Sequence, residues 1–188
     1  KCSVCGAVTG KTVIAKASNI KLSKTAYTYN GKVQKPSVTV KDSKGKALKS
    51  TDYKIDYPKG MKNVGKYTVK MTLKGNYSGS KSMTYNINPK GTGVSKVTAA
   101  KKGFKVTWKK QATQTTGYQV QYSTSSKFKS AKTVTISKNK TTSKSVSKLS
   151  AKKKYYVRVR TYKTVKVNGK NVKLYSGWSK AKSVTTKK

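Results

Sequence analysis

The chain contains no histidine and no glutamate, and only three of its 188 residues are acidic: Asp42, Asp52 and Asp56. Without histidine, the commonest general base at neutral pH is missing, and paired-carboxylate chemistry depends on the aspartates alone. Asp52 and Asp56 are four residues apart, which would place them on the same face of a strand. We interpret them as turn and surface residues that pair with lysine. The sequence therefore predicts that the protein is not an enzyme.

Cysteine is almost as scarce, since Cys2 and Cys5 are the only two in the chain. Their C-x-x-C spacing supplies half of a zinc site, but this sequence holds no further cysteine or histidine to complete it. A thioredoxin-like redox motif would require an α/β context that is missing. We expect a local disulfide, or ligation completed by residues upstream of a fragment. Calcium usually needs six or more oxygen ligands, so we predict no metal site and no cofactor.

Long apolar runs and helical periodicity are also absent. No apolar stretch is long enough to cross a bilayer, so we expect no transmembrane segment. No window shows a helical period, whereas valine, threonine and the 13 tyrosines favour strands. The chain is therefore predicted to be all-β.

Turn signals divide the chain into four parts. Residues 1–18 hold both cysteines and a short "TVI" strand. Residues 19–89 read as short strands between turns such as Asn30-Gly31, and "NPKGTG" supplies a linker at 90–93. Residues 94–188 contain a second set of strands, which includes "KGFKVTWKK", "TGYQVQYS", "KTVTIS", "SKSVSKL", "KYYVRVRTYKTVKV" and "LYSGWSKAKSVTT". Within them, Asn168-Gly169 predicts a tight hairpin. The strand number and spacing of residues 94–188 predict an immunoglobulin-like β-sandwich.

Residues 94–188 resemble a fibronectin type III domain. The resemblance rests on Trp108 in "FKVTWKK", on "GYQVQYS", on Leu149 six residues before Tyr155, and on "YYVRVRTY" and "GWSKAKSVTT". It implies that Leu149 and Tyr155 form a tyrosine corner and that Trp108 fills the core between the sheets. No Arg-Gly-Asp triplet is present, so integrin binding does not carry over from the family.

Residues 19–89 resemble a bacterial immunoglobulin-like repeat of Gram-positive surface and secreted proteins. The matching stretches are "YTYNGKVQKPSVTV", "STDYKIDYPKGMKNVGKYTVKMTLKGNYSG" and "YNINP". The segment "KCSVCGAVTGKTVI" is similar to the tail of a cysteine-containing repeat found upstream in such chains. Together with the resemblance of residues 94–188, this implies an all-β chain of two tandem immunoglobulin-like β-sandwiches. The resemblances also imply a bacterial protein that is secreted or attached to the cell surface.

Positive charge is the dominant feature of the composition. The chain has 45 Lys+Arg residues against three acids, which gives a formal net charge of +42. Such a field repels copies of itself, which favours a monomer, and it attracts polyanions such as anionic cell-wall polymers or acidic glycans. Specific nucleic-acid binding is not expected, because no nucleic-acid-binding motif is present and lysine is spread over the whole chain. A lineage-wide preference for lysine in secreted proteins explains the charge equally well.

The stretch from Leu149 to Val165, "LSAKKKYYVRVRTYKTV", interleaves basic and aromatic residues. If Tyr155 faces the core, alternation points Val157 and Val159 inward as well. The remaining side chains then share an outward face with those of the neighbouring "GYQVQY" strand. The predicted ligand face comprises Tyr156, Arg158, Arg160, Tyr162, Gln119 and Gln121. The alternative is that these are ordinary solubilising positions of a strand.

Two functions remain open from the sequence. The first is a non-catalytic extracellular module that serves as a spacer, display or adhesion unit of a larger bacterial protein. The second is a targeting module that binds anionic polymers of the cell wall, mucin or acidic polysaccharide through its lysine-rich surface.

Overall fold

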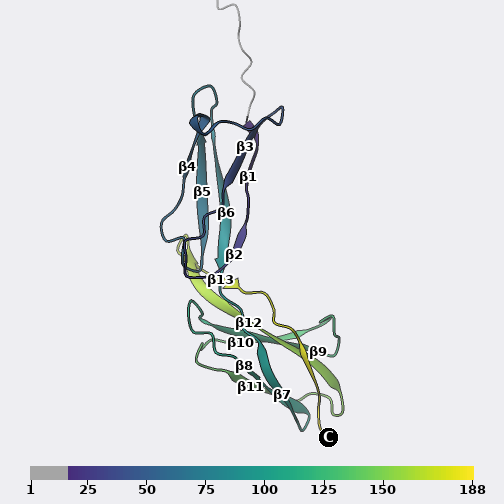
Figure 1. Ribbon diagram of the computed structural model, residues 1–188. Coiled ribbons are helices and arrows are strands. Elements are labelled where there is room, and N and C mark those ends of the chain that lie inside the picture. Colours follow the sequence, from purple (N-terminus) through teal and green to yellow (C-terminus); the bar gives the residue numbers. More distant parts are fainter. Residues whose placement is uncertain (1–16) are drawn as a thin grey trace, which may run out of the picture. The chain divides into compact units, whose positions relative to one another are not determined.

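A computed structural model of the chain describes residues 17–188 (Figure 1). These residues form strands joined by turns, with one short 3-10 turn at Ser50–Asp52 (η2) and no α-helix within the described range. The all-β class predicted from the sequence is therefore confirmed. Cys2 and Cys5 lie outside the described residues, and their predicted pairing stays a prediction.

The described chain divides by its contacts into two compact units. The first unit comprises residues 17–25, 36–59 and 68–84, and the second comprises residues 26–35, 60–67 and 85–188. Strands β5 (Gly65–Leu73) and β6 (Ser80–Asn88) contribute residues to both.

The first unit contains two paired sets of strands. Strand β1 (Ala17–Leu22) runs antiparallel to β3 (Val38–Asp42), and β4 (Tyr53–Asp56) runs antiparallel to β5. Aspartates fix the turns of this unit through backbone amides. The Asp42 carboxylate accepts hydrogen bonds from the amides of Lys44 and Lys46, each at 2.9 Å. Alternating apolar residues such as Val69 and Met71, both at 0% exposure, give the unit its core.

The second unit contains a β-sandwich whose strands follow the alternating runs of the sequence. One layer has the order β11 (Ser143–Val146), β8 (Gly103–Trp108) and β7 (Val94–Ala100). The other has the order β10 (Lys132–Ile136), β9 (Gly117–Ser123), β12 (Lys154–Val167) and β13 (Lys170–Tyr175), and β14 (Lys182–Thr185) also pairs with β12. Figure 1 shows β7, β8 and β11 on one side of this unit and β9, β10 and β12 on the other.

The core of the sandwich lies between these two layers. Its buried side chains come from both sheets and are Val94, Phe104, Val106, Trp108, Tyr118, Val120, Tyr122, Val146, Tyr155, Val157 and Val159. They occupy alternate positions along their strands, because successive side chains of a strand point to opposite faces. The burial of Tyr118, Val120 and Tyr122 on β9 matches the inward set predicted for that strand.

Strand β12 is the longest of the strands in the described residues, and three other strands of its sheet pair with it. Its first part pairs with β14 and its last part with β13, while β9 pairs with it from Tyr156 to Tyr162. The predicted hairpin between β12 and β13 is confirmed, since Asn168 and Gly169 have φ angles of 50° and 77°. Positive φ at both central residues is the signature of the tight turn that Asn-Gly favours.

Candidate functional site

The candidate site is the outer surface of the sheet around Arg158 and Arg160. Along β12, Val157 and Val159 are fully buried, whereas the two arginines between and after them are half-exposed. The register places Arg158 opposite Gln121 and Arg160 opposite Gln119 on β9. The two strands are therefore neighbours with a shared outward face, as alternation predicts.

Two rows of hydrogen bonds cross this face. In the first row, the Gln121 amide nitrogen donates to the Thr133 hydroxyl at 3.1 Å, and its oxygen accepts from Nε and Nη2 of Arg158 at 2.8 and 2.5 Å. The second row repeats this pattern with Thr135, Gln119 and Arg160. Its distances are 3.2 Å for the amide donor and 2.9 and 2.7 Å for the two guanidinium nitrogens.

These rows fix the orientation of both guanidinium groups. Each glutamine oxygen accepts two charge-assisted hydrogen bonds, which are stronger than neutral ones. The threonine hydroxyl at the other end of each row determines which way the amide points. Each arginine is therefore held in one orientation on the sheet.

Aromatic rings cover the flat faces of the guanidinium groups. The Arg158 Cζ atom lies 3.9 Å from the ring centroid of Phe128 and 4.7 Å from that of Trp178. The Arg160 Cζ atom lies 3.9 Å from the Tyr175 centroid and 4.3 Å from the Trp178 centroid. Trp178 thus contacts both cations. We call these five side chains, Phe128, Arg158, Trp178, Arg160 and Tyr175, the arginine stack.

The segment that carries Trp178 is attached to β12 by serine hydroxyls. The Ser176 hydroxyl accepts the Thr161 amide at 3.1 Å, and the Ser179 hydroxyl accepts the Val159 amide at 3.0 Å. The serine amides in turn donate to the carbonyls of Thr161 and Val159 at 3.1 and 2.8 Å. Between the end of β13 and the start of β14, serine hydroxyl oxygens thus accept the β12 amide hydrogen bonds that backbone carbonyls of a paired strand would otherwise accept.

Burial shifts the titration of groups in and beside the stack. It lowers the pKa of the Arg158 guanidinium from its ordinary value. Burial also lowers the pKa of Arg160, with Tyr175 opposing this shift and Arg158 adding to it. Arginine remains charged at neutral pH in either case, because its ordinary pKa is so high. The face thus retains two fixed positive charges.

The two tyrosines of the predicted ligand face lie in different environments. Tyr156 is half-exposed, with the Lys154 ammonium 5.4 Å from its ring centroid. Tyr162, which alternation assigns to the outward face, is only 2% exposed. Its ring centroid lies 6.1 Å from that of Tyr175, and the Lys173 ammonium lies 5.2 Å from its ring. The hairpin through β13 brings these groups over Tyr162 and removes it from the accessible surface.

Three aromatic members of the arginine stack were not among the predicted site residues: Phe128, Tyr175 and Trp178. Phe128 lies in the loop after β9 and has a φ of 56°, an unusual conformation for a bulky residue. Tyr175 and Trp178 belong to "YSGWS". The two serines flanking a tryptophan in that stretch were the signal that could have identified the segment.

The residues predicted to be structural lie in or against the core. Trp108 is 3% and Tyr155 8% exposed, and Leu149 packs against the same core cluster. Trp108 contacts Tyr118 with 5.3 Å between ring centroids.

The remaining aspartates are engaged in local structure. The Asp52 carboxylate accepts the Lys49 amide at 3.1 Å in the short 3-10 turn. Asp56 forms an ion pair with Lys54 at 2.7 Å. Residues 17–188 contain no group of three or more histidine, cysteine, aspartate or glutamate side chains that could hold a metal ion.

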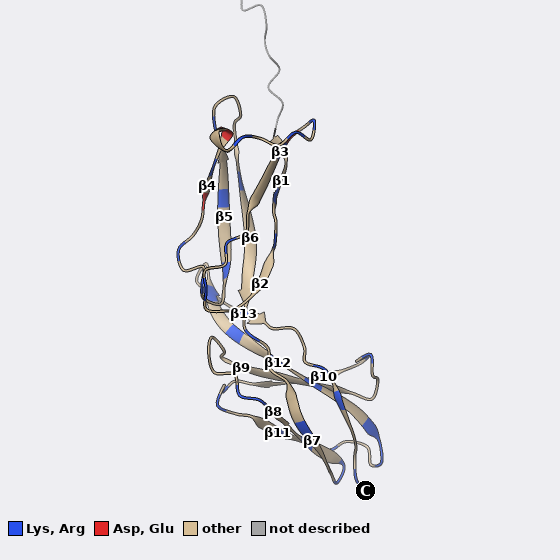
Figure 2. Cartoon of the chain, viewed as in Figure 1, with Lys and Arg blue, Asp and Glu red and all other residues tan. Residues whose placement is uncertain are grey.

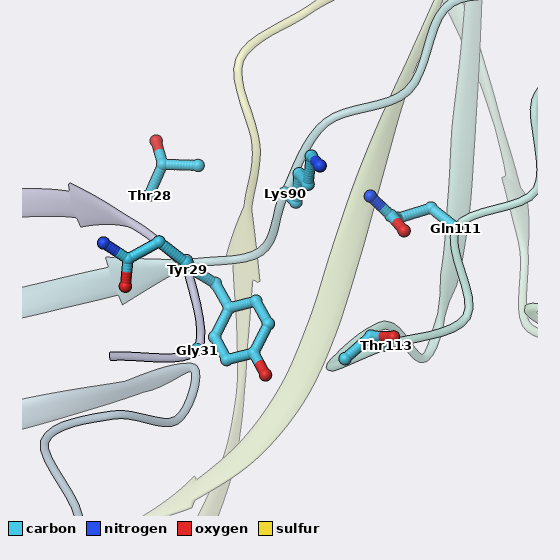
Figure 3. Close-up of a pocket in the computed structure, with 7 residues that line it drawn as sticks. Thr28, Tyr29, Gly31, Lys90, Gln111 and Thr113 are labelled. Atoms are coloured by element: carbon cyan, nitrogen blue, oxygen red, sulfur yellow. The ribbon is translucent and has the colours of Figure 1, made fainter. Parts of the chain in front are cut away.

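The second unit also has an open pocket of about 530 Å³ that the sequence did not predict (Figure 3). The pocket is lined by Thr28, Tyr29, Asn30, Gly31, Lys90, Gln111 and Thr113. Figure 3 shows the Tyr29 ring, the Lys90 side chain and the Gln111 amide around it. The Asn30 side-chain oxygen accepts a hydrogen bond from the Lys32 amide at 2.9 Å, which stabilises the turn that contains both residues.

Among the described residues, no helix has the length and apolar character needed to span a bilayer.

One family model matches part of the chain. Residues 87–174 match the family model described as "Fibronectin type III domain". No curated protein sequence matches the chain. Among solved structures, the chain is similar to the FN1–FN3 domains of chicken CNTN1, with 15% identity, a TM-score of 0.46, and coverage of 92% of this chain and 67% of that one.

Two further structures show similarities of the same order. A two-domain fibronectin type III segment of chicken tenascin has 16% identity and a TM-score of 0.47, with 92% of this chain and 99% of that chain covered. A beta-1,2-glucanase from Parabacteroides distasonis has 12% identity and a TM-score of 0.38. That similarity covers 65% of this chain and 18% of the glucanase.

Proposed function

Because residues 87–174 match the fibronectin type III family model, we propose that the chain is a non-catalytic module of a larger extracellular bacterial protein. The family match carries this proposal, because fibronectin type III domains are typically non-catalytic modules of multidomain proteins. In this role the module spaces, displays or tethers other parts of that protein at the cell surface.

The state of the polar groups supports this role. Asp42 and Asp52 accept hydrogen bonds from backbone amides in turns, and Asp56 forms an ion pair at the surface. Across the outer sheet face, the glutamines and both arginines bond to one another and to threonines. These contacts stabilise a rigid sheet, which suits a spacer.

Within this module we propose the boundaries given by the sequence. Residues 19–89 form an immunoglobulin-like repeat, residues 90–93 a linker and residues 94–188 the fibronectin type III domain. The experiment is to express residues 90–188 alone. We expect a monomer in sedimentation, a β-type circular dichroism spectrum and one cooperative unfolding transition. A segment that unfolds without cooperativity or self-associates would contradict the boundary and the monomeric state.

Localisation has a separate test. Antibodies against the module should detect it in the culture medium or the cell-wall fraction of the bacterium that produces it. Detection confined to the cytosol would overturn the extracellular role.

A second candidate function is attachment to anionic polymers, and the charge of +42 favours it. Figure 2 shows lysine and arginine on strands and loops of both units. Binding should be measured on peptidoglycan with and without teichoic acid, on mucin and on DNA, across a salt series. Charge-driven binding loses affinity steeply as salt rises, because screening and counterion release weaken it. Absence of binding to all four at physiological salt would leave the spacer role alone.

A further inference from the structure

Arg158 and Arg160 are positive charges without an ionic partner. Neither guanidinium forms an ion pair with a side chain of residues 17–188, and no acidic residue follows Asp56 in the sequence. Their partners are instead two neutral amides and three aromatic rings. Partly buried charges are stabilised by an opposite charge. The stack therefore lacks the one partner that would neutralise it.

The hydrogen bonds leave a defined edge of each guanidinium free. Arginine has five N–H donors, and here Nε and Nη2 bind the glutamine oxygen. No atom of residues 17–188 accepts from Nη1 of either arginine. Two aromatic rings also lie within 5 Å of each Cζ atom, so the edge that carries Nη1 is the part of each group that is left for a ligand. The N–H groups at the edge of a guanidinium are the donors that bind the oxygens of a carboxylate, sulfate or phosphate.

The spacing of the two edges favours a polymer. Two residues along a strand span about 7 Å, and the glutamine rows hold both groups in the same orientation. A chain that carries oxyanions at successive positions would contact both arginines at once. Single-stranded nucleic acid binds through base stacking on free aromatic rings. The three rings of the arginine stack already hold guanidinium groups, so this surface favours a polyanion without bases.

We propose that Arg158 and Arg160 form a binding site for successive carboxylate or sulfate groups of an acidic polysaccharide. This proposal rests on the second candidate function, attachment to anionic polymers. It makes that function more specific, because it assigns recognition of the polymer to two fixed arginines and not to the lysine-rich surface as a whole. Trp178, Phe128 and Tyr175 are positioning residues, and they keep the two guanidinium edges in place. Lysine at positions 158 and 160 would keep the charge but lose the planar group.

The test uses the whole chain with polygalacturonate, chondroitin sulfate, polyphosphate and oligo-dT as probes, at physiological salt. Arg158→Lys with Arg160→Lys should weaken polygalacturonate or chondroitin sulfate binding about tenfold, because charge-assisted hydrogen bonds from a fixed fork are lost. The matched control is Lys105→Gln with Lys144→Gln. It removes two charges from exposed positions of the other sheet, and it should change affinity less than about threefold.

A second measurement avoids dependence on the folding of the variant. The chain has two tryptophans, so nitrogen-15 spectra of the unsubstituted protein should give separate indole N–H signals for Trp108 and Trp178. Polygalacturonate should shift the Trp178 and arginine Nε signals and leave the signal of the buried Trp108 in place.

Each outcome decides the proposal. If the double Arg→Lys variant binds as the parent does while the lysine control weakens, the arginine site is wrong but charge-driven attachment stands. If the parent binds no probe, both are wrong. Oligo-dT bound more tightly than every polysaccharide, or polyphosphate preferred over both glycans, would overturn the assignment to acidic polysaccharide.

Discussion

At the residue scale, adjacent side chains of one strand have different roles. Tyr155 is 8% exposed and packs against Phe104 and Tyr122, with both centroid separations 6.3 Å. Tyr156, the next residue, is half-exposed on the outer face. The same amino acid is therefore a core residue at one position and a surface residue at the next.

Because of this difference, we expect truncation of Tyr155 and of Tyr156 to lower the free energy of unfolding by unequal amounts. Tyr155→Ala should lower the free energy of unfolding by about 3 kcal/mol, because it removes a buried ring and leaves a cavity. Tyr156→Ala should cost less than about 1 kcal/mol. Urea unfolding of both variants measures the difference, and equal losses would show that Tyr155 does not act as a core residue.

Tyr122 predicts a loss of stability at high pH. Burial raises the pKa of its phenol above 10.0, and the neighbouring Tyr155 raises it further. The unfolded chain therefore loses this proton first, so the contribution to stability is complete below about pH 10 and is lost as pH rises through the folded pKa. Tyr122→Phe should flatten the fall in unfolding free energy as pH rises above about 10. The difference between variant and parent should stay constant at lower pH; a parallel fall in both proteins would contradict the assignment.

At the scale of elements, the segment between β13 and β14 is attached to β12 by side chains. Ser179→Ala should lower the free energy of unfolding by about 1 to 3 kcal/mol, because it leaves the Val159 amide without its acceptor. Hydrogen exchange at that amide should accelerate. The matched control is Ser183→Ala, at an exposed position of β14, which should leave both quantities within error. Unchanged exchange at Val159 would show that the hydroxyl is not its partner.

The pairing of β9 with β10 depends on a glycine. A Cβ atom at Gly117 would clash with the backbone oxygen of Ile136 and lie 3.1 Å from the Tyr162 ring. Gly117→Ala should therefore destabilise the protein by about 1 to 3 kcal/mol through overpacking. A Cβ atom at Gly177 would meet nothing within 4 Å, so Gly177→Ala is the control. Thermal unfolding of the two variants should differ by several degrees, and equal melting temperatures would contradict the predicted clash.

At the scale of the whole molecule, the net charge of +42 opposes compact folding. Raising NaCl from 10 to 300 mM should increase the melting temperature by several degrees, because the screening length falls from about 30 Å to below 10 Å. KCl at the same ionic strength should give the same increase. A melting temperature that does not change with salt would show that self-repulsion contributes little to the stability.

The sequence by itself determined the strands and which of their side chains face inward. The period of two follows from local backbone geometry, so Tyr118, Val120, Val157 and Val159 could be assigned to the core without knowledge of their partners. Turn chemistry was local in the same way, as the Asn168-Gly169 hairpin confirms. The charge of the surface also required only composition.

Only the tertiary structure decided what surrounds the two arginines. Alternation placed Arg158 and Arg160 outward beside Gln119 and Gln121, and the register confirms that pairing. Their rings come from a loop after β9, from the last residue of β13 and from the segment that follows β13. The burial of Tyr162 has the same origin, because Tyr175 reaches it across the β12–β13 hairpin. Strand periodicity fixes the direction of a side chain, whereas its neighbours depend on how separate segments pack, and no local pattern encodes that.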